Sequence, residues 1–162
     1  MQKNNIKGTC CFIGHRKVEN KDKIEKELFN IVKQLIIDED ISIFLFGSRS
    51  EFNDLCYKVV SELKQVSPNI LRIYVRAEYP IINEEYNQHL LKYYEETFFP
   101  DKIINAGKSI YIQRNKYLID NSNVCVFHFI PNNYSKVDLK RKSGTKLALD
   151  YAKSKKKNII MI

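Results

Sequence analysis

The chain has 162 residues, 44% of them hydrophobic, which predicts a single domain with one core over residues 1–162. No apolar run approaches the ~18 residues of a membrane span, and residues 1–5 are polar, without the apolar core of a secretion signal, so we expect a cytoplasmic protein. The four cysteines and three histidines show neither a disulfide framework nor the spacing of metal ligands, so we expect no metal and no cofactor.

The net charge of +8 is concentrated near the C-terminus. Residues 135–162 contain nine Lys or Arg and two Asp, a net charge of +7, which leaves +1 for the rest of the chain. The basic residues crowd one loop and one helix end: Lys136, Lys140, Arg141, Lys142, Lys153, Lys155, Lys156 and Lys157. A solvated surface is the simplest interpretation, and attraction of an anionic ligand or of nucleic acid is the functional one.

The first predicted strand opens into a polar turn. Thr9-Cys10-Cys11-Phe12-Ile13 is apolar on both faces, as in the middle of a parallel sheet, and Gly14-His15-Arg16 follows at its carboxyl end. Ligands of open parallel sheets gather at that edge. An ordinary turn in which Arg16 pairs with a nearby helix is the alternative.

A second strand repeats this arrangement. Apolar residues recur at helical spacing over 21–37, and the next strand, 41–46, ends at Gly47-Ser48-Arg49-Ser50. The following helix, marked by Leu55, Val59 and Leu63, points its N-terminus at this turn, which favours an anion. Capping of that helix by Ser50 also explains the serines.

The remaining elements continue the alternation. We expect a strand at 70–75, a helix at 83–94, a short strand at 109–112, a helix at 114–120, a strand at 124–130, a helix from Ser143 and a last strand at 158–162. The polar loop 131–142 is expected to be mobile. The tyrosines of 83–94 are interpreted as core or homodimer contacts rather than as a stacking platform.

These elements predict an α/β fold, a three-layer Rossmann-like sandwich with a mostly parallel five-stranded sheet. Neither GxxxxGK[ST] nor GxGxxG occurs, so the chain is neither a P-loop NTPase nor a dinucleotide dehydrogenase of the usual kind.

The chain resembles the SLOG superfamily of Rossmann-like proteins, which includes the DNA-uptake protein Smf/DprA and the Lonely Guy enzymes, and is closest to its small bacterial members. The resemblance covers almost the whole chain, through Cys11-Phe12-Ile13-Gly14-His15-Arg16, the glycine turn with Phe52-Asn53, Arg114-Asn115, Asp120, and Ser143-Gly144-Thr145 leading to Tyr151-Ala152. It implies strand order 3-2-1-4-5 and a pocket for a nucleotide or nucleotide-derived molecule.

The resemblance also implies which residues bind the ligand. Arg114 is the main cationic clamp, because a guanidinium binds phosphate in a bidentate way. Ser143, Gly144 and Thr145 hold phosphate at a helix N-terminus. The implied ligand-binding set is completed by Gly14, His15, Arg16, Gly47, Ser48, Arg49, Asn53, Arg76 and Asn115.

Two departures from the family argue against hydrolysis. Lonely Guy enzymes carry Pro-Gly-Gly-x-Gly-Thr-x-x-Glu, and the position of their glutamate is occupied here by Ala148. Cleavage of an N-glycoside needs a carboxylate to stabilise the developing charge or to activate water. Small family members often have Phe-Asp where this chain has Phe52-Asn53.

Three functions therefore remain open. The first is binding or sensing of a phosphorylated nucleotide-derived ligand without hydrolysis. The second is nucleoside monophosphate N-glycosidase activity that uses Asp54, Glu78 or Asp120, although helix capping and an Arg76–Glu78 ion pair are the commoner use of such carboxylates and are the favoured interpretation. The third is single-stranded nucleic-acid binding through the basic C-terminal region, which lacks interleaved aromatic residues.

Overall fold

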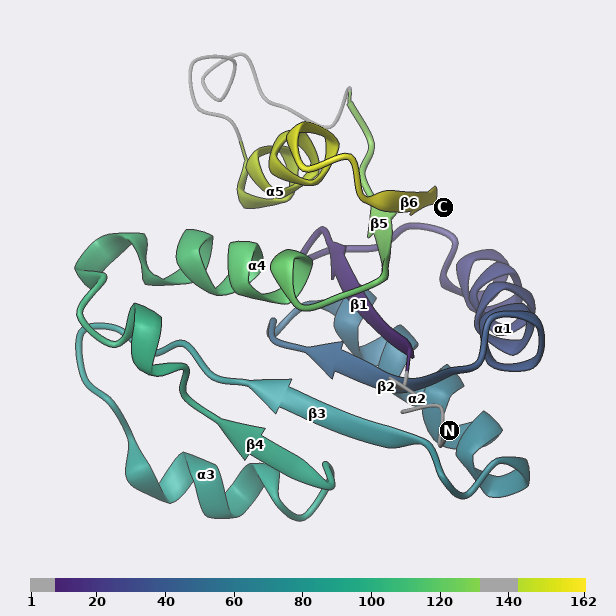
Figure 1. Cartoon of the computed structure of the whole chain (residues 1–162), viewed down its shortest axis with the longest axis horizontal. Coiled ribbons are helices and arrows are strands. Elements are labelled where there is room, and N and C mark those ends of the chain that lie inside the picture. Colours follow the sequence, from purple (N-terminus) through teal and green to yellow (C-terminus); the bar gives the residue numbers. More distant parts are fainter. Residues whose placement is uncertain (1–7, 132–142) are drawn as a thin grey trace, which may run out of the picture.

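The computed structural model describes residues 8–131 and 143–162, which form a parallel sheet covered by helices on both faces (Figure 1). The strands are β1 (Gly8–Gly14), β2 (Ile41–Phe46), β3 (Leu71–Val75), β4 (Glu96–Phe98), β5 (Val124–His128) and β6 (Asn158–Met161). The helices are α1 (Lys21–Asp38), α2 (Glu51–Val66), α3 (Glu84–Leu90), α4 (Ile110–Asp120) and α5 (Gly144–Ser154), with 3₁₀ turns η1 (Asp101–Ile103) and η2 (Gly107–Ser109).

The strand order is β4-β3-β2-β1-β5-β6, and every pair is parallel. The predicted α/β fold and the predicted order of five strands are confirmed, and β4 adds a sixth strand beyond β3. Three residues are too few to show a periodic pattern, so β4 was not predicted.

Alternation along the central strand divides the core into two layers. Cys10 and Phe12 pack against α1 and α2, whereas Cys11 and Ile13 pack against α4 and α5. The two adjacent cysteines therefore face opposite sides of the sheet. The buried stripe of α1 consists of Ile24, Leu28, Val32 and Leu35, in agreement with the helical spacing of apolar residues over 21–37.

Two other expectations are wrong. Residues 109–112 are not a strand, because Ser109 ends η2 and α4 begins at Ile110. The helix expected over 83–94 ends at Leu90, after which a turn leads the chain to β4. Expectations for residues 132–142, including Lys136, Lys140, Arg141 and Lys142, fall outside the described residues.

A half-buried ion cluster attaches β4 to the sheet. The guanidinium Nη2 of Arg72 lies 2.9 Å from Oε1 of Glu95, the amide of Arg72 donates to Oε2 at 2.9 Å, and Lys64 Nζ approaches Oε1 at 3.1 Å. Burial opposes ionisation of Glu95, but these donors outweigh it and lower the pKa of Glu95 to about 2.

Replacement of Glu95 should therefore lower the free energy of unfolding by an amount that depends on pH. The folded pKa lies below the ordinary value of 4.5, so the contribution of the carboxylate is complete above that value and is lost as the pH falls towards 2. At pH 7 we expect Glu95→Gln to lower the free energy of unfolding by about 1 to 3 kcal/mol. Urea denaturation measures this.

The difference between the wild type and Glu95→Gln should shrink between pH 4.5 and 2, and a difference that stays constant over this range would contradict the account. Glu62→Gln, at an exposed position of α2, is the matched control and should resemble the wild type at each pH.

Candidate functional site

The carboxyl ends of the parallel strands meet at one edge of the sheet, where the predicted turns gather. Gly14 of β1 is the register partner of His128 of β5, and Phe46 of β2 is the partner of Tyr74 of β3. In Figure 1 the arrowheads of β2 and β3 point towards the end at which α4 begins. The helix N-termini of α4 and α5 and the turn after β2 therefore share this edge.

Arg114, in the first turns of α4, extends over the turn that follows β2. A Cβ at position 47 would lie 2.7 Å from Cδ of Arg114 and 3.2 Å from the carbonyl oxygen of Val75, so Gly47 leaves the space that the arginine occupies. Arg114 is only 6% exposed. This close approach explains why the turn needs a glycine.

No carboxylate neutralises Arg114 within the described part of the chain. Its Nε donates to Oδ1 of Asn115 at 3.0 Å, and Cζ lies 5.9 Å from the ring centre of Tyr111. Burial lowers the pKa of Arg114, and the nearby hydroxyls of Tyr74, Tyr111 and Tyr86 partly offset that effect. A buried guanidinium with aromatic and amide neighbours is an electropositive point that an anion would satisfy.

The other glycines of the predicted site have different roles. A Cβ on Gly14 would overlap the ring of Phe52, which stacks on His128 with ring centres 5.4 Å apart. Gly14 therefore makes room for core packing rather than for a ligand. At Gly144 a Cβ would meet no atom within 4 Å, so this glycine lies in open space at the start of α5.

His15 and Arg16 tie the turn after β1 to its neighbours. Nε2 of His15 accepts a hydrogen bond from the amide of Ile130 at 2.9 Å, and burial together with nearby His128 lowers the pKa of His15. The carbonyl of Arg16 accepts from the amide of Glu51 at 2.9 Å, and its side chain is exposed. Among the described residues Glu51 pairs with Lys17 and Lys21 and not with Arg16.

The turn after β2 borders a cavity of about 330 Å³ between α2, β3 and α3. Its lining comprises Ser48, Arg49, Asn53, Asp54, Tyr57, Tyr74, Tyr86, His89, Leu90, Tyr93 and Tyr94. Four of these eleven residues were predicted as site residues. We call this space the tyrosine-lined cavity.

The polar residues of this cavity have distinct partners. Ser48 Oγ lies 2.7 Å from Ser50 Oγ, and Ser50 caps α2 by accepting from the amide of Asn53, as the capping interpretation predicts. Arg49 donates from Nε to the hydroxyl of Tyr86 at 3.2 Å, with Cζ 4.4 Å from the ring centre. Partial burial and the nearby Glu51 carboxylate raise the pKa of Asp54.

Arg76 and Glu78 neutralise each other. Arg76 is 4% exposed, and it donates to the Glu78 carboxylate at 2.9 and 3.0 Å and to the carbonyl of Asn83 at 2.7 Å. This is the ion pair that competes with a catalytic role for Glu78. It leaves Arg76 without a free face for a ligand and holds the loop between β3 and α3.

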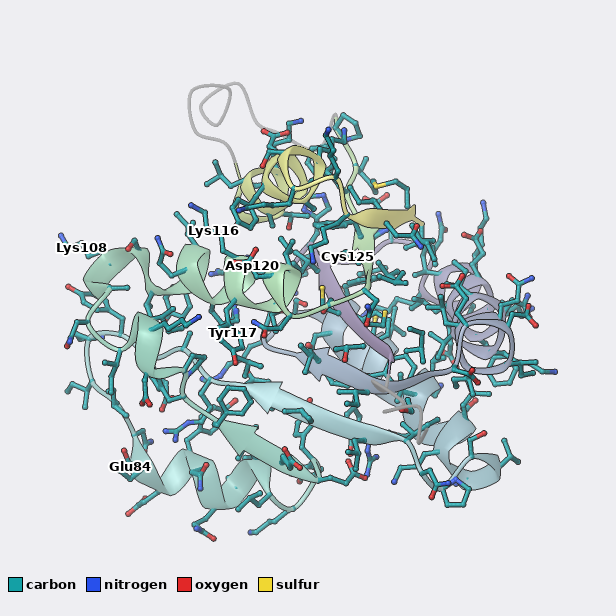
Figure 2. All side chains as sticks on the ribbon, in the orientation of Figure 1. Glu84, Lys108, Lys116, Tyr117, Asp120 and Cys125 are labelled. Carbon is teal, nitrogen blue, oxygen red and sulfur yellow. The ribbon has the colours of Figure 1, made fainter. Side chains whose placement is uncertain are left out.

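Asp120 lies away from the other candidates. It ends α4 four residues before β5 begins, so it sits at the amino end of that strand. Its carboxylate accepts from the hydroxyl of Tyr151 at 2.9 and 3.0 Å. Figure 2 shows Lys108 and Asp120 near opposite ends of α4. The expectation that Asp120 joins the ligand pocket is therefore not supported by its position.

The start of α5 is capped by its own serine. Ser143 Oγ accepts from the amide of Lys146 at 3.0 Å, and Thr145 is buried. Ala148, four positions after Gly144, is 3% exposed and packs in the core layer beneath α4 and α5. A carboxylate there would be buried against apolar side chains.

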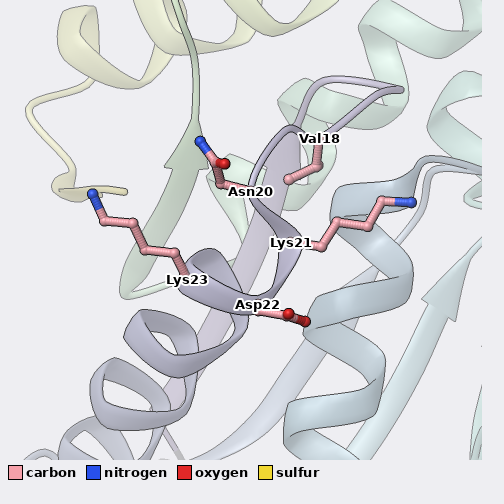
Figure 3. Close-up of a pocket in the computed structure, with 5 residues that line it drawn as sticks. All are labelled: Val18, Asn20, Lys21, Asp22 and Lys23. Atoms are coloured by element: carbon pink, nitrogen blue, oxygen red, sulfur yellow. The ribbon is translucent and has the colours of Figure 1, made fainter.

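A second hollow, of about 670 Å³, lies at the start of α1 and is lined by Val18, Asn20, Lys21, Asp22 and Lys23 (Figure 3). Figure 3 shows Lys21 pointing towards α2, while Asn20 and Lys23 point the opposite way. Side chains that diverge do not form a binding site.

Lys153, Lys155 and Lys156 are exposed at the end of α5, at the opposite edge from its capped start.

The interpretation of the tyrosines of 83–94 as core contacts is confirmed for Tyr86 and Tyr94, which pack against the core. That the same rings line a cavity was not predicted. Tyr86, Leu90 and Tyr94 recur at helical spacing, which is the same pattern for a core stripe and for the wall of a cavity. The available signal was Tyr74, a polar aromatic residue one position before the end of β3.

The sequence matches no family model, and no curated protein is significantly similar to it.

Over residues 8–131 and 143–162 no group of three or more His, Cys, Asp or Glu side chains could hold a metal ion. None of the helices in these segments is long and apolar enough to cross a membrane.

The isolation of Arg114 predicts a gain in stability when its charge is removed. A buried cation without a carboxylate costs folding free energy, and methionine fills similar space without that cost. We expect Arg114→Met to raise the free energy of unfolding by about 1 to 3 kcal/mol in the absence of ligand. Denaturant titration measures it, with Lys116→Met on the same helix as the control. A loss of stability would contradict the interpretation.

Proposed function

We propose that the protein binds a nucleotide or a nucleotide-derived phosphorylated ligand at the carboxyl edge of its sheet, without hydrolysing it. The observation that carries this proposal is Arg114, a buried guanidinium over Gly47 with no carboxylate partner among the described residues. A phosphate would supply the missing negative charge through paired hydrogen bonds.

The helix arrangement supports the same ligand chemistry. The N-termini of α4 and α5 lie on one face and at one edge of the sheet, where their amide groups favour an anion. The resemblance to the SLOG superfamily adds its own support, because that resemblance implies a nucleotide pocket at this edge. Within that family this chain would be a binding or sensing protein, since Ala148 replaces the glutamate of the Lonely Guy enzymes.

Ligand titrations of Arg114 variants test the proposal. Isothermal calorimetry with AMP, ADP-ribose and cyclic AMP should detect binding by at least one of them, and Arg114→Ala should weaken it at least ~30-fold because a charge-assisted bidentate contact is lost. The affinity of Arg114→Lys should lie between those of the wild type and Arg114→Ala, because lysine keeps the positive charge but lacks the planar guanidinium.

Lys116→Ala is the matched control, because it removes one positive charge from the same helix. Lys116 lies against the ring of Tyr151, with Nζ 5.2 Å from the ring centre, away from Gly47. Wild-type affinity is expected for this variant. Absence of binding by all three compounds, or equal affinity in Arg114→Ala, would refute the proposal.

A second candidate function has one observation in its favour. Of the three carboxylates predicted for hydrolysis, Asp54 alone lines the tyrosine-lined cavity, and its pKa is raised by partial burial and by Glu51. A nucleoside monophosphate N-glycosidase would use such a group near the sugar.

If this candidate is right, incubation with purine and pyrimidine monophosphates releases free base, which chromatography detects. Asp54→Asn should then lower the rate by at least ~100-fold, while Asp120→Asn, at the other edge of the sheet, leaves it unchanged. Release that persists in Asp54→Asn, or no release at all, excludes Asp54 as the catalytic group.

A further inference from the structure

The tyrosine-lined cavity is built from aromatic rings that contact one another. The ring centres of Tyr57 and Tyr94 are 5.1 Å apart, those of Tyr74 and Tyr94 are 5.2 Å apart, and His89 stacks on Tyr86 at 6.1 Å with an interplanar angle of 17°. Its volume of about 330 Å³ is in the range that holds small ligands. Such a wall suits a flat ring, because aromatic surfaces stack on one another.

Asn53 supplies an unsatisfied polar atom at the same place. The residue lines the cavity and is 4% exposed, yet its Oδ1 has no hydrogen-bond partner. A buried acceptor without a donor costs folding free energy. A ligand that presents an N–H group would satisfy this atom.

The cavity and Arg114 meet at the turn after β2. Arg114 lies against Gly47, and the next residue, Ser48, lines the cavity. The hydroxyls of Tyr74 and Tyr86, which line the cavity, also partly offset the effect of burial that lowers the pKa of Arg114. One molecule could therefore place an anion at Arg114 and a ring in the cavity.

We infer that the tyrosine-lined cavity is the base subsite of the bound nucleotide, where a nucleobase stacks on tyrosine rings and donates an N–H group to Oδ1 of Asn53. This inference rests on the proposed function and adds the part of the ligand that sets specificity. Arg49 lies over the ring of Tyr86, donates to its hydroxyl and holds that ring in place.

Comparison of ligands with and without a base tests the inference. Calorimetry uses AMP and ADP-ribose against ribose 5-phosphate, which has the phosphate and the sugar but no base. AMP or ADP-ribose should bind at least tenfold more tightly than ribose 5-phosphate. In Asn53→Leu this advantage should fall to less than threefold, while the affinity for ribose 5-phosphate stays unchanged.

Asn53→Leu also separates recognition from folding. Leucine keeps a similar size. Removal of the unsatisfied oxygen offsets the loss of the hydrogen bond between the Asn53 side chain and Tyr94, so the unfolding midpoint without ligand should not fall. A lower midpoint with unchanged preference for AMP would assign Asn53 a structural role and overturn the inference. Asn121→Leu, at an exposed position after α4, is the matched control and should keep the preference for the base.

Failure of this inference can be told from failure of the proposed function. Equal binding of AMP, ADP-ribose and ribose 5-phosphate, all weakened in Arg114→Ala, overturns the base subsite and leaves the phosphate site intact. If none of the three binds, both are overturned.

Discussion

The burial of Arg114 is the constraint on which the arrangement of this edge depends. The side chain crosses the turn after β2, and the turn accommodates it because position 47 has no Cβ. Burying a guanidinium without a carboxylate is costly. A protein that retains an unpaired buried guanidinium is less stable than it would be without it. Proteins commonly tolerate such a loss of stability at sites that bind charged ligands.

The contrast with the other buried arginine supports this view. Arg76 also lies at the carboxyl edge and is equally buried, but it donates to the carboxylate of Glu78 and to the carbonyl of Asn83. The half-buried Arg72, at the far end of β3, is paired with Glu95. The chain therefore neutralises Arg76 and Arg72 with its own carboxylates and leaves Arg114 with an amide and tyrosines.

Much of the fold was predictable, because runs of three or four apolar residues indicate the buried strands and helical spacing indicates the stripe of α1. β4 was not, because three residues gain their structure from pairing with β3 and from the Arg72–Glu95 contact. For the candidate site, strand ends indicated the edge of the sheet at which these turns gather, and the resemblance to a family indicated Arg114. The tyrosine-lined cavity escaped notice because 3.6-residue spacing does not distinguish a core from a cavity wall.

A crystal structure of the protein soaked with AMP would show directly whether Arg114 binds the phosphate of the ligand. We expect phosphate density within hydrogen-bond distance of the Arg114 guanidinium, beside the turn at Gly47. Density for the phosphate elsewhere, with Arg114 paired to a carboxylate of its own chain, would contradict it.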